Sequence, residues 1–301
     1  MYDLVCVGNV SVDIYFSGKN LTQLDGRYHL AIGGKYYVDF FYEDIGGGAV
    51  NVAAGVSKLG LRPVIFGKVG HNSYKELILK KLVDKKISTE FCDFQDDYYK
   101  VSAILITEKG ERTIINYETP AHLLRSFYLN EDLKKAKNIY FSPLPNLDLK
   151  TKKKIISYLK GDQTLTFVNL SSVDCQKGIS ELKEIFDGLD VLLVNSHEFS
   201  LLIKKDYQKI DFKNLKIKLP YLKERVVIIT DGEKGSYGYL KDKFYYQEAY
   251  RPKKIVDTTG CGDAYTAGFI AQYIKTGNIA LSMQKGAEMA KKKLERMGGS
   301  W

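Results

Sequence analysis

The chain of 301 residues is 45% hydrophobic and 27% charged, and its formal net charge at pH 7 is +9. This length allows one large α/β domain or two small ones with a substantial core, and the apolar content is that of a globular protein. Because no apolar run approaches the ~20 residues needed to cross a bilayer, we expect no membrane-spanning helix.

The excess of lysine does not by itself indicate a nucleic-acid-binding protein. The densest runs, Lys152–Lys154 and Lys291–Lys293, lie in helix-like segments that have acidic neighbours. No nucleic-acid-binding motif accompanies them. We therefore interpret both runs as solvated helix faces, and we expect neither a nucleic acid nor a membrane as a partner.

The cysteines stand far apart in the sequence and form no Cys-x-x-Cys pair. They are Cys6, Cys92, Cys175 and Cys261. This spacing favours neither a zinc site nor a disulfide framework, and it fits a reducing compartment. The N-terminal residues contain Asp3 and no basic region before an apolar stretch, so they do not read as a secretory signal. We expect a cytoplasmic protein.

The first strand is expected at Leu4–Val7, a short apolar run that ends at Gly8. Asp13 follows this strand closely. In open α/β sheets, ligands bind at the edge formed by the carboxyl ends of the strands. Asp13 is therefore a candidate ligand contact, although a solvent-exposed loop aspartate explains the same sequence.

Residues 15–45 are rich in aromatic residues and glycine, and they show no helical period. This pattern predicts short strands with one apolar face. The aromatic side chains gather at Tyr36, Tyr37, Phe40, Phe41 and Tyr42. An exposed aromatic patch as dense as this one also fits a dimer interface.

The glycine run Gly46–Gly48 opens a helix of small residues that is expected to end at Gly60. Glycine lets a ligand approach the backbone, and the Asn51 amide can both donate a hydrogen bond to a hydroxyl and accept one. These residues are candidate ligand contacts. A structural loop with close helix packing is the alternative interpretation.

After residue 138, apolar strands alternate with helical patterns, which predicts a parallel sheet covered by helices on both faces. The chain has no composition break, long linker or internal repeat, so we expect a single domain over residues 1–301. The parallel strands of this part are expected at Asn138–Phe141, Thr164–Val168, Val191–Val194 and Val226–Thr230. A hairpin is expected at Ser236–Leu240 and Phe244–Gln247.

Polar residues follow two of these strands. Asn195 and Glu198 come after Val191–Val194, and a carboxylate with an amide oxygen at a strand end suits a hard cation that keeps most of its waters. A helix cap explains the same pair. After the next strand, Gly232 and Gly235 would allow a ligand to approach the backbone.

The most informative stretch has Gly260-Cys261-Gly262-Asp263 at its centre. Apolar spacing after it predicts a helix that opens near Asp263. The amides of residues 260–262 would then lie at a helix N-terminus, which attracts anions. A carboxylate at this place cannot bind phosphate, but it can take a proton from an attacking hydroxyl. The combination suggests phosphoryl transfer to an alcohol.

The stretch Asp-Thr-Thr-Gly-Cys-Gly-Asp-Ala at 257–264, continued by Ala267-Gly268-Phe269, resembles the C-terminal signature of the ribokinase-like, or PfkB, family of carbohydrate kinases. The family usually has alanine where Cys261 stands, at a position that contributes its backbone. The glycine run with Asn51 resembles the family's N-terminal signature. The resemblance extends through several ordered motifs over nearly the whole chain.

The resemblance implies a three-layer α/β/α core with a mostly parallel sheet and a small β-sheet lid, formed by about residues 14–45 and 98–118. It implies ATP and Mg²⁺ as cofactors, Asp263 as the base and an anion hole at Gly260, Cys261 and Gly262. Matching positions imply substrate contacts at Asp13, Gly47, Gly48 and Asn51, nucleotide contacts at Thr230, Gly232 and Gly235, and magnesium contacts at Asn195 and Glu198. Many members also hold K⁺, here at Asp257 and the Thr259 carbonyl, and some form homodimers through the lid.

We expect a kinase that moves the γ-phosphoryl group of ATP to a hydroxymethyl group of a small ribose- or fructose-type sugar. The alternative acceptor is an adenosine-type nucleoside, because Tyr37 or Phe40 could stack on a base. A non-catalytic sugar or nucleotide sensor is less favoured, because the expected catalytic residues are present. The chain has neither a P-loop nor a dinucleotide-binding fingerprint. No second basic cluster is placed to bind a sugar phosphate, which favours an unphosphorylated acceptor.

Overall fold

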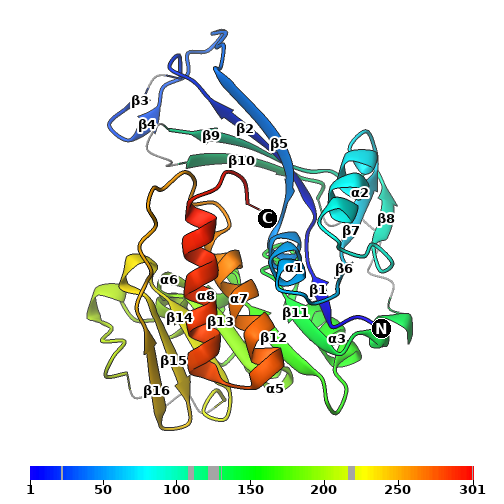
Figure 1. Ribbon diagram of the computed structural model, residues 1–301, viewed down its shortest axis with the longest axis vertical. Helices are drawn as coiled ribbons and strands as arrows, with labels where there is room; N and C mark the ends of the chain where they lie inside the picture. The colour runs from blue at the N-terminus through cyan, green and yellow to red at the C-terminus, as the bar shows by residue number, and fades with distance from the viewer. Residues whose placement is uncertain (22, 108–111, 121–128, 130, 216–220, 300) are drawn as a thin grey trace.

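An eight-stranded sheet forms the centre of the molecule (Figure 1). The computed structural model describes residues 1–301 apart from 22, 108–111, 121–128, 130, 216–220 and 300. The strand order is β16-β15-β14-β13-β12-β11-β1-β6. The parallel strands are β1 (Leu4–Val7), β6 (Pro63–Phe66), β11 (Asn138–Phe141), β12 (Leu165–Asn169), β13 (Val191–Asn195) and β14 (Val226–Thr230). The antiparallel strands β15 (Ser236–Leu240) and β16 (Lys243–Gln247) extend one edge.

Helices cover both faces of this sheet, because the side chains of each strand alternate between two hydrophobic cores. In β1, Leu4 and Cys6 belong to one core, and Val5 and Val7 belong to the other. The first core includes α1 (Gly48–Lys58), α2 (Lys75–Asp84), α7 (Cys261–Thr276) and α8 (Ile279–Leu294). The second includes α3 (Leu149–Leu159), α4 (Ser172–Lys177), α5 (Lys183–Gly188) and α6 (Ser196–Leu202). The expected three-layer α/β/α core is confirmed. In the part of the chain that the structure describes, no helix is long and apolar enough to cross a membrane.

The observed strands agree closely with the predicted ones, whereas α7 begins earlier than predicted. Strands β1, β11 and β14 have the predicted bounds. Helix α7 begins at Cys261 rather than near Asp263. The reason is Gly260, whose left-handed φ of 71° turns the chain into the helix, so that the Ala264 amide already donates to the Gly260 carbonyl at 2.8 Å.

A second sheet of four strands lies above the first in Figure 1, and β1 leads directly into it. Its order is β10-β9-β2-β5. The strands are β2 (Ser11–Ser17), β5 (Phe40–Gly46), β9 (Lys100–Ile106) and β10 (Arg112–Glu118). They lie mostly within the segments expected to form a lid, but each has seven residues, longer than the short strands predicted for 15–45. The sequence also predicts strands at Val101–Thr107 and Thr113–Tyr117 joined by a turn at residues 109–112, of which only Arg112 lies in the described part of the chain.

The two faces of the second sheet differ in chemistry. Residues opposite one another on neighbouring strands share a face. Asp13 on β2 lies opposite Asp44 on β5 and Ser102 on β9, and all three are buried. The other face is apolar and exposed, with Phe41 on β5 and Ile115 on β10. The face that carries Asp13, on which Tyr15, Ile104 and Ile106 are also buried, is therefore turned toward the rest of the molecule.

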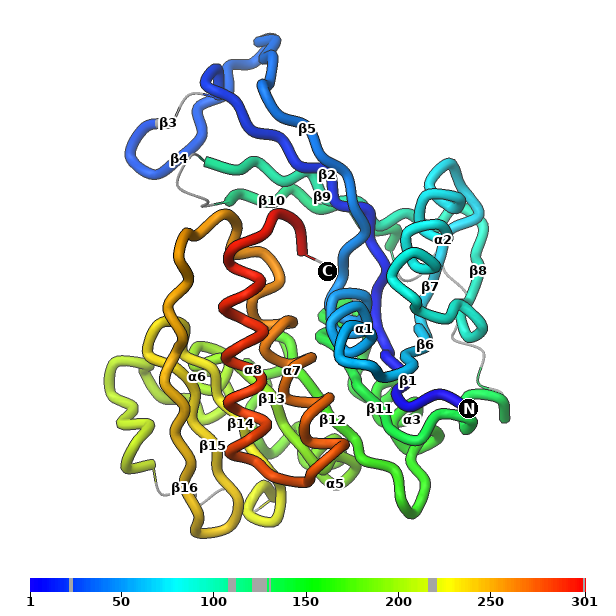
Figure 2. The backbone as a smooth tube through the Cα atoms, in the orientation of Figure 1, coloured from blue at the N-terminus to red at the C-terminus, as the bar shows by residue number. Residues whose placement is uncertain are grey.

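Three chain segments meet between the two sheets. Residues 8–10 join β1 to β2, and the end of β5 leads through Gly47 into α1 (Figure 2). The C-terminal residues end near this junction in both views. There the Gly299 amide donates to the Tyr15 hydroxyl of β2 at 3.0 Å. The junction gathers most of the residues singled out in the sequence.

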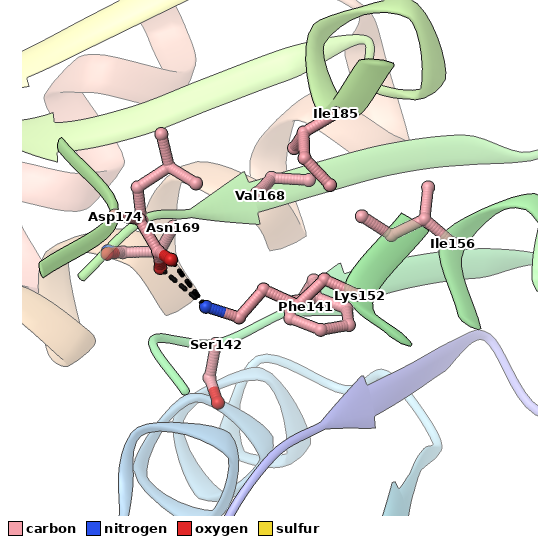
Figure 3. Close-up of a pocket in the computed structure, with 9 residues that line it drawn as sticks. Phe141, Ser142, Lys152, Ile156, Val168, Asn169, Asp174 and Ile185 are labelled. Atoms are coloured by element: carbon pink, nitrogen blue, oxygen red, sulfur yellow. Dashed lines mark hydrogen bonds and ion pairs between the residues drawn. The ribbon is translucent and has the colours of Figure 1, made fainter. Parts of the chain in front are cut away.

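Each lysine run contains one lysine that is not solvated. Lys152 on α3 is 2% exposed, and its Nζ lies 2.6 and 2.7 Å from the two carboxylate oxygens of Asp174 (Figure 3). The pocket around this pair leaves no room for a water molecule. Lys293, in the second run, is 0% exposed. The interpretation of both runs as solvated faces is wrong at these two positions, because the sequence does not show which distant groups compensate a buried ammonium.

Candidate active site

One hydrogen bond joins the start of α1 to the start of α7. Asn51 Nδ2 donates to Asp263 Oδ2 at 2.7 Å, across 212 positions of the chain. Gly47 is the N-cap of α1, and a Cβ on Gly48 would lie 3.7 Å from Asp263 Oδ1. The predicted base therefore lies beside three of the predicted substrate contacts.

The two glycines of the predicted anion hole have different surroundings. A Cβ on Gly260 would lie 2.2 Å from the Gly299 carbonyl oxygen, so packing and the positive φ both require glycine there. A Cβ on Gly262 would meet no atom within 4 Å. Gly262 thus leaves an open approach to the N-terminus of α7, where free amides and the helix dipole attract anions. Between them, the Cys261 amide donates to the Thr258 carbonyl at 3.3 Å.

A buried carboxylate organises the loop before α7. Asp257 is 0% exposed, and it accepts hydrogen bonds from the Thr259 amide at 2.8 Å and from the Gly298 amide at 2.9 Å. The two residues predicted to hold K⁺, Asp257 and Thr259, are thus in contact. The bond to Gly298 ties the loop to the C-terminal residues, which in turn contact β2.

Asp13 is not an exposed loop residue. It lies within β2 and is 6% exposed, so the alternative interpretation from the sequence is wrong. Its Oδ1 accepts a hydrogen bond from Ser11 Oγ at 2.9 Å, and a Cβ on Gly46 would lie 1.9 Å from its Oδ2. Burial raises the pKa of Asp13, and the neighbouring Asp44 raises it further. The glycine run therefore makes room for this carboxylate.

Two further carboxyl groups have strongly shifted pKa values. Burial raises the pKa of Asp263 to about 6, against the hydrogen bond from Asn51, and the Asp13 carboxylate adds to the rise. Burial raises the pKa of Glu198 to about 7, and Asp263 adds to this rise. Among the described residues, no lysine or arginine forms an ion pair with either group. This part of the site therefore carries negative charge that no protein cation within contact neutralises.

Asn195 and Glu198 form a capping box at the start of α6. Asn195 Oδ1 accepts from the Glu198 amide at 2.8 Å, and Glu198 Oε2 accepts from the Asn195 amide at 2.9 Å. The helix cap weighed from the sequence is thus present. It uses one oxygen of the Glu198 carboxylate, so Oε1 remains outside the cap.

The predicted nucleotide contacts lie at the same edge of the sheet. Thr230, the last residue of β14, pairs with Asn195 at the end of β13. The turn after Thr230 contains the short helix η4 (Gly232–Lys234) and then Gly235. A Cβ on Gly232 would meet no atom within 4 Å, so this part of the turn is open to a ligand.

Three buried oxygens near these residues have no hydrogen-bond partner among the described residues: Asn51 Oδ1, Ser142 Oγ and Thr259 Oγ1. Ser142 follows β11 and lies against Gly8 and Gly48. Because buried polar groups normally have partners, these oxygens mark places where a ligand or water can bind. Ser142 cannot be identified from the sequence, since a single serine after a strand gives no signal.

Arg112 is a second residue that the sequence analysis did not assign to the site. It begins β10 of the second sheet, yet its Nη1 donates to Thr258 Oγ1 in the loop before α7. Its charge also lowers the pKa of Cys261, although burial raises that pKa more strongly. Arg112 therefore brings a positive charge from the second sheet to the start of α7. The signal available in the sequence was a basic residue at the turn between the strands that became β9 and β10.

The sequence model described as pfkB family carbohydrate kinase matches residues 1–300 of this chain. Probable fructokinase-5 of Arabidopsis thaliana is 29% identical over 253 residues, which cover 79% of this chain and 76% of the plant protein. The nucleoside kinase of Methanocaldococcus jannaschii is 28% identical over 316 residues, covering 99% of this chain and 92% of the archaeal protein.

The structure is also similar to that of Arabidopsis thaliana ribokinase complexed with ribose and ATP. The TM-score is 0.77 at 18% identity, with 99% of this chain and 94% of the ribokinase chain covered. At this identity the likeness shows the fold alone, whereas the family match spans nearly the whole sequence. The chain therefore belongs to the pfkB family of carbohydrate kinases.

Proposed function

We propose that this kinase transfers the γ-phosphoryl group of ATP to a hydroxymethyl group of a small sugar, with Asp263 as the general base. The observation that carries the proposal is the placement of the Asp263 carboxylate. It lies in the first turn of α7, next to the open approach at Gly262, and is hydrogen-bonded to Asn51. A pKa of about 6 leaves it ionised at neutral pH while keeping it more basic than an exposed aspartate.

Charge on the transferred phosphoryl group would be stabilised at the N-terminus of α7. The backbone of Gly260, Cys261 and Gly262 supplies this anion hole together with the helix dipole. The cysteine in place of the usual alanine leaves the backbone contribution intact. Arg112 lies close enough to add a positive charge from the second sheet, which we propose acts as a lid.

Magnesium would be held at Asn195 and Glu198. The donor set fits this ion: the Glu198 carboxylate has a raised pKa and no ion-pair partner among the described residues, and Mg²⁺ favours oxygen ligands while keeping several waters. Bound Mg²⁺ would neutralise charge on the phosphates. The phosphates of ATP would lie along Thr230, Gly232 and Gly235, which follow the adjacent strand.

The acceptor would lie between the two sheets, against Asp13, Gly47, Gly48 and Asn51. Asp13 can accept hydrogen bonds from hydroxyl groups, and Asn51 Oδ1 is a buried acceptor that has no partner among the described residues. An unphosphorylated sugar is favoured, because two half-buried lysines beside Asp44 are already engaged in ion pairs. They are Lys81 and Lys85, which form ion pairs with Asp44 at 3.6 and 3.3 Å.

A nucleoside is the second candidate acceptor. The relative from Methanocaldococcus jannaschii, which this chain covers almost completely, is named a nucleoside kinase. Phe40 lies on the same face of the second sheet as Asp13 and is 39% exposed, so it could stack on a base. A non-catalytic sensor is less favoured, because Asp263, Asn195 and Glu198 all lie at the site.

The exposed apolar face of the second sheet suits a second copy of the chain. Phe41 is 58% exposed on β5, and Ile115 and Tyr117 are 59% and 57% exposed on β10, at the two edges of the same face of this sheet. Apolar side chains grouped in this way mark an interaction surface. We propose a homodimer formed through the lid. A cytoplasmic location fits the cysteines, which are all free thiols.

The first test is ADP release from Mg-ATP against free sugars, sugar phosphates and nucleosides. We expect turnover with a free ribose- or fructose-type sugar. Selective turnover with nucleosides would establish the second candidate instead. If neither class is turned over while ATP or a sugar still raises the melting temperature, the protein is a sensor.

Asp263→Asn should lower kcat by about 10²–10⁴-fold, because the amide cannot accept the proton, while acceptor affinity is retained. In the wild type, kcat/KM should fall as the pH drops through about 6, where the base becomes protonated.

Since the folded state raises the pKa of Asp263, the wild type with this group ionised is destabilised at high pH. The variant should therefore melt at a higher temperature than the wild type at pH 8, and this difference should shrink as the pH falls toward 4. Full activity of the variant would rule out the assigned base.

Gly260→Ala and Gly262→Ala form a matched pair. At Gly260 the new methyl group meets the Gly299 carbonyl at a positive φ, so stability should fall by about 1–3 kcal/mol. At Gly262 the methyl group meets no protein atom, so the melting temperature should stay near that of the wild type while kcat/KM for ATP falls. Thermal unfolding and steady-state kinetics separate the two effects. Unchanged kinetics for Gly262→Ala would contradict an anion site there.

Ile115→Lys should convert a dimer into a monomer, because it places a charge on the exposed apolar face. Light scattering coupled to gel filtration measures the change. Lys19→Ala, on an exposed residue after β2, is the control and should leave the mass unchanged. A wild type that is monomeric at high protein concentration would contradict the dimer.

A further inference from the structure

Lys293 is a fully buried lysine at the back of the proposed anion hole. It lies in the last turn of α8 and is 0% exposed. Its Nζ donates to the Arg296 carbonyl at 3.1 Å. Lysine is rarely buried without a compensating group, so this position calls for an explanation.

The main chain around Lys293 is attached directly to the loop before α7. One residue further along, the Leu294 carbonyl accepts a hydrogen bond from the Val256 amide at 2.8 Å. One turn earlier, the Ala290 carbonyl accepts a hydrogen bond from Cys261 Sγ at 3.7 Å. Lys293 lies between these two contacts, so its side chain is enclosed behind residues 256–261.

The buried group beside Lys293 is the carboxylate of Asp257, whose main chain is attached to the last turn of α8: the Asp257 amide lies 3.5 Å from the Leu294 carbonyl oxygen. The two described hydrogen bonds to that carboxylate come from neutral amides. Burial lowers the pKa of Lys293, whereas the Asp257 carboxylate raises it. A cation close to a buried carboxylate offsets part of the cost of burying it.

This arrangement does not fit the potassium ion that the family resemblance implied at Asp257 and Thr259. Each carboxylate oxygen of Asp257 already accepts one amide hydrogen bond, which leaves one lone pair on each, and the Arg296 carbonyl accepts from Lys293. A second cation would also be repelled by the Lys293 ammonium and by the guanidinium groups of Arg112 and Arg296, which lower the pKa of Lys293.

We propose that the Lys293 ammonium is a built-in cation that takes the place of a bound monovalent ion behind the loop of residues 257–262. Lys293 would act as a positioning residue: it fixes Asp257, and through Asp257 the amides that the proposed function assigns to the anion hole. The kinase then neither binds nor requires K⁺ at this place. The inference rests on the proposed function only for the role of those amides.

Wild-type protein is tested first, in KCl and in choline chloride at the same ionic strength. We expect kcat to agree within about twofold, and we expect K⁺ to leave the melting temperature unchanged, because an ion that does not bind cannot stabilise the folded state. Strong activation by K⁺, or a K⁺-specific rise in the melting temperature of the wild type, would overturn the proposal. The comparison of melting temperatures needs no turnover, so it tests whether K⁺ binds even if the proposed function is wrong.

Two variants then separate a cation role from simple packing. Lys293→Ala removes the charge and opens space beside Asp257, so K⁺ or NH₄⁺ should restore part of the lost kcat and raise the melting temperature. Lys293→Met removes the charge but fills the space, so neither ion should rescue it. The loss of kcat should be about tenfold or more, below the 10²–10³-fold of a deleted anion-hole donor.

The matched control is Lys292→Ala, which removes an exposed lysine from the same turn of α8. It should behave as the wild type in every salt. Wild-type activity of Lys293→Met, or equal rescue of the Ala and Met variants, would contradict the proposal. If both Lys293 variants fail to fold, the effect of K⁺ on the melting temperature of the wild type still supports the proposal or overturns it.

Discussion

One electrostatic constraint shapes the site. Buried carboxylates lie close to the N-terminus of α7, where we propose that the phosphate groups bind. Asp257 accepts hydrogen bonds from two amides, and we propose that the ammonium of Lys293 adds a positive charge behind it. Glu198 and Asp263 have only uncharged hydrogen-bond donors among their described partners, and their pKa values are raised accordingly. These are the groups that we propose bind a metal ion and accept a proton. The neighbours of each buried carboxylate therefore distinguish Asp257 from Glu198 and Asp263.

Much of the architecture follows from local patterns in the chain. Buried parallel strands such as β11 and β14 are short apolar runs between turn residues, and their bounds could be predicted because both faces of the strand must be apolar. The start of α7 was placed too late, because the sequence does not reveal that Gly260 takes a left-handed conformation. The strands of the second sheet have seven residues each and are longer than predicted. Their polar residues face the junction between the sheets rather than solvent, which the sequence does not show.

What the sequence could not provide was the set of long-range partners. The motifs indicated Asp263 and Asn51 separately, but only the fold shows the hydrogen bond between them. Arg112 reaches the loop before α7 from a strand, and Lys293 is buried at the end of a helix that is far from Arg112 in the chain. The expected turn and the lysine run that contain these residues do not reveal where the side chains lie. Lysine runs are usually solvated, so a buried member such as Lys152 becomes visible only when its carboxylate partner is located.

The division of the site between the two sheets bears on how such a kinase can diversify. The residues proposed to handle phosphate lie on α6, α7 and the turn after β14, all within the main sheet and its helices. Asp13 and the aromatic residue Phe40 belong instead to the second sheet, which joins the core through short segments at residues 8–10 and Gly47. If the proposed acceptor site is correct, substitutions in the second sheet change one side of it and leave the residues proposed to handle phosphate untouched. The contacts from α1, at Gly48 and Asn51, would then be kept while the choice of alcohol shifts.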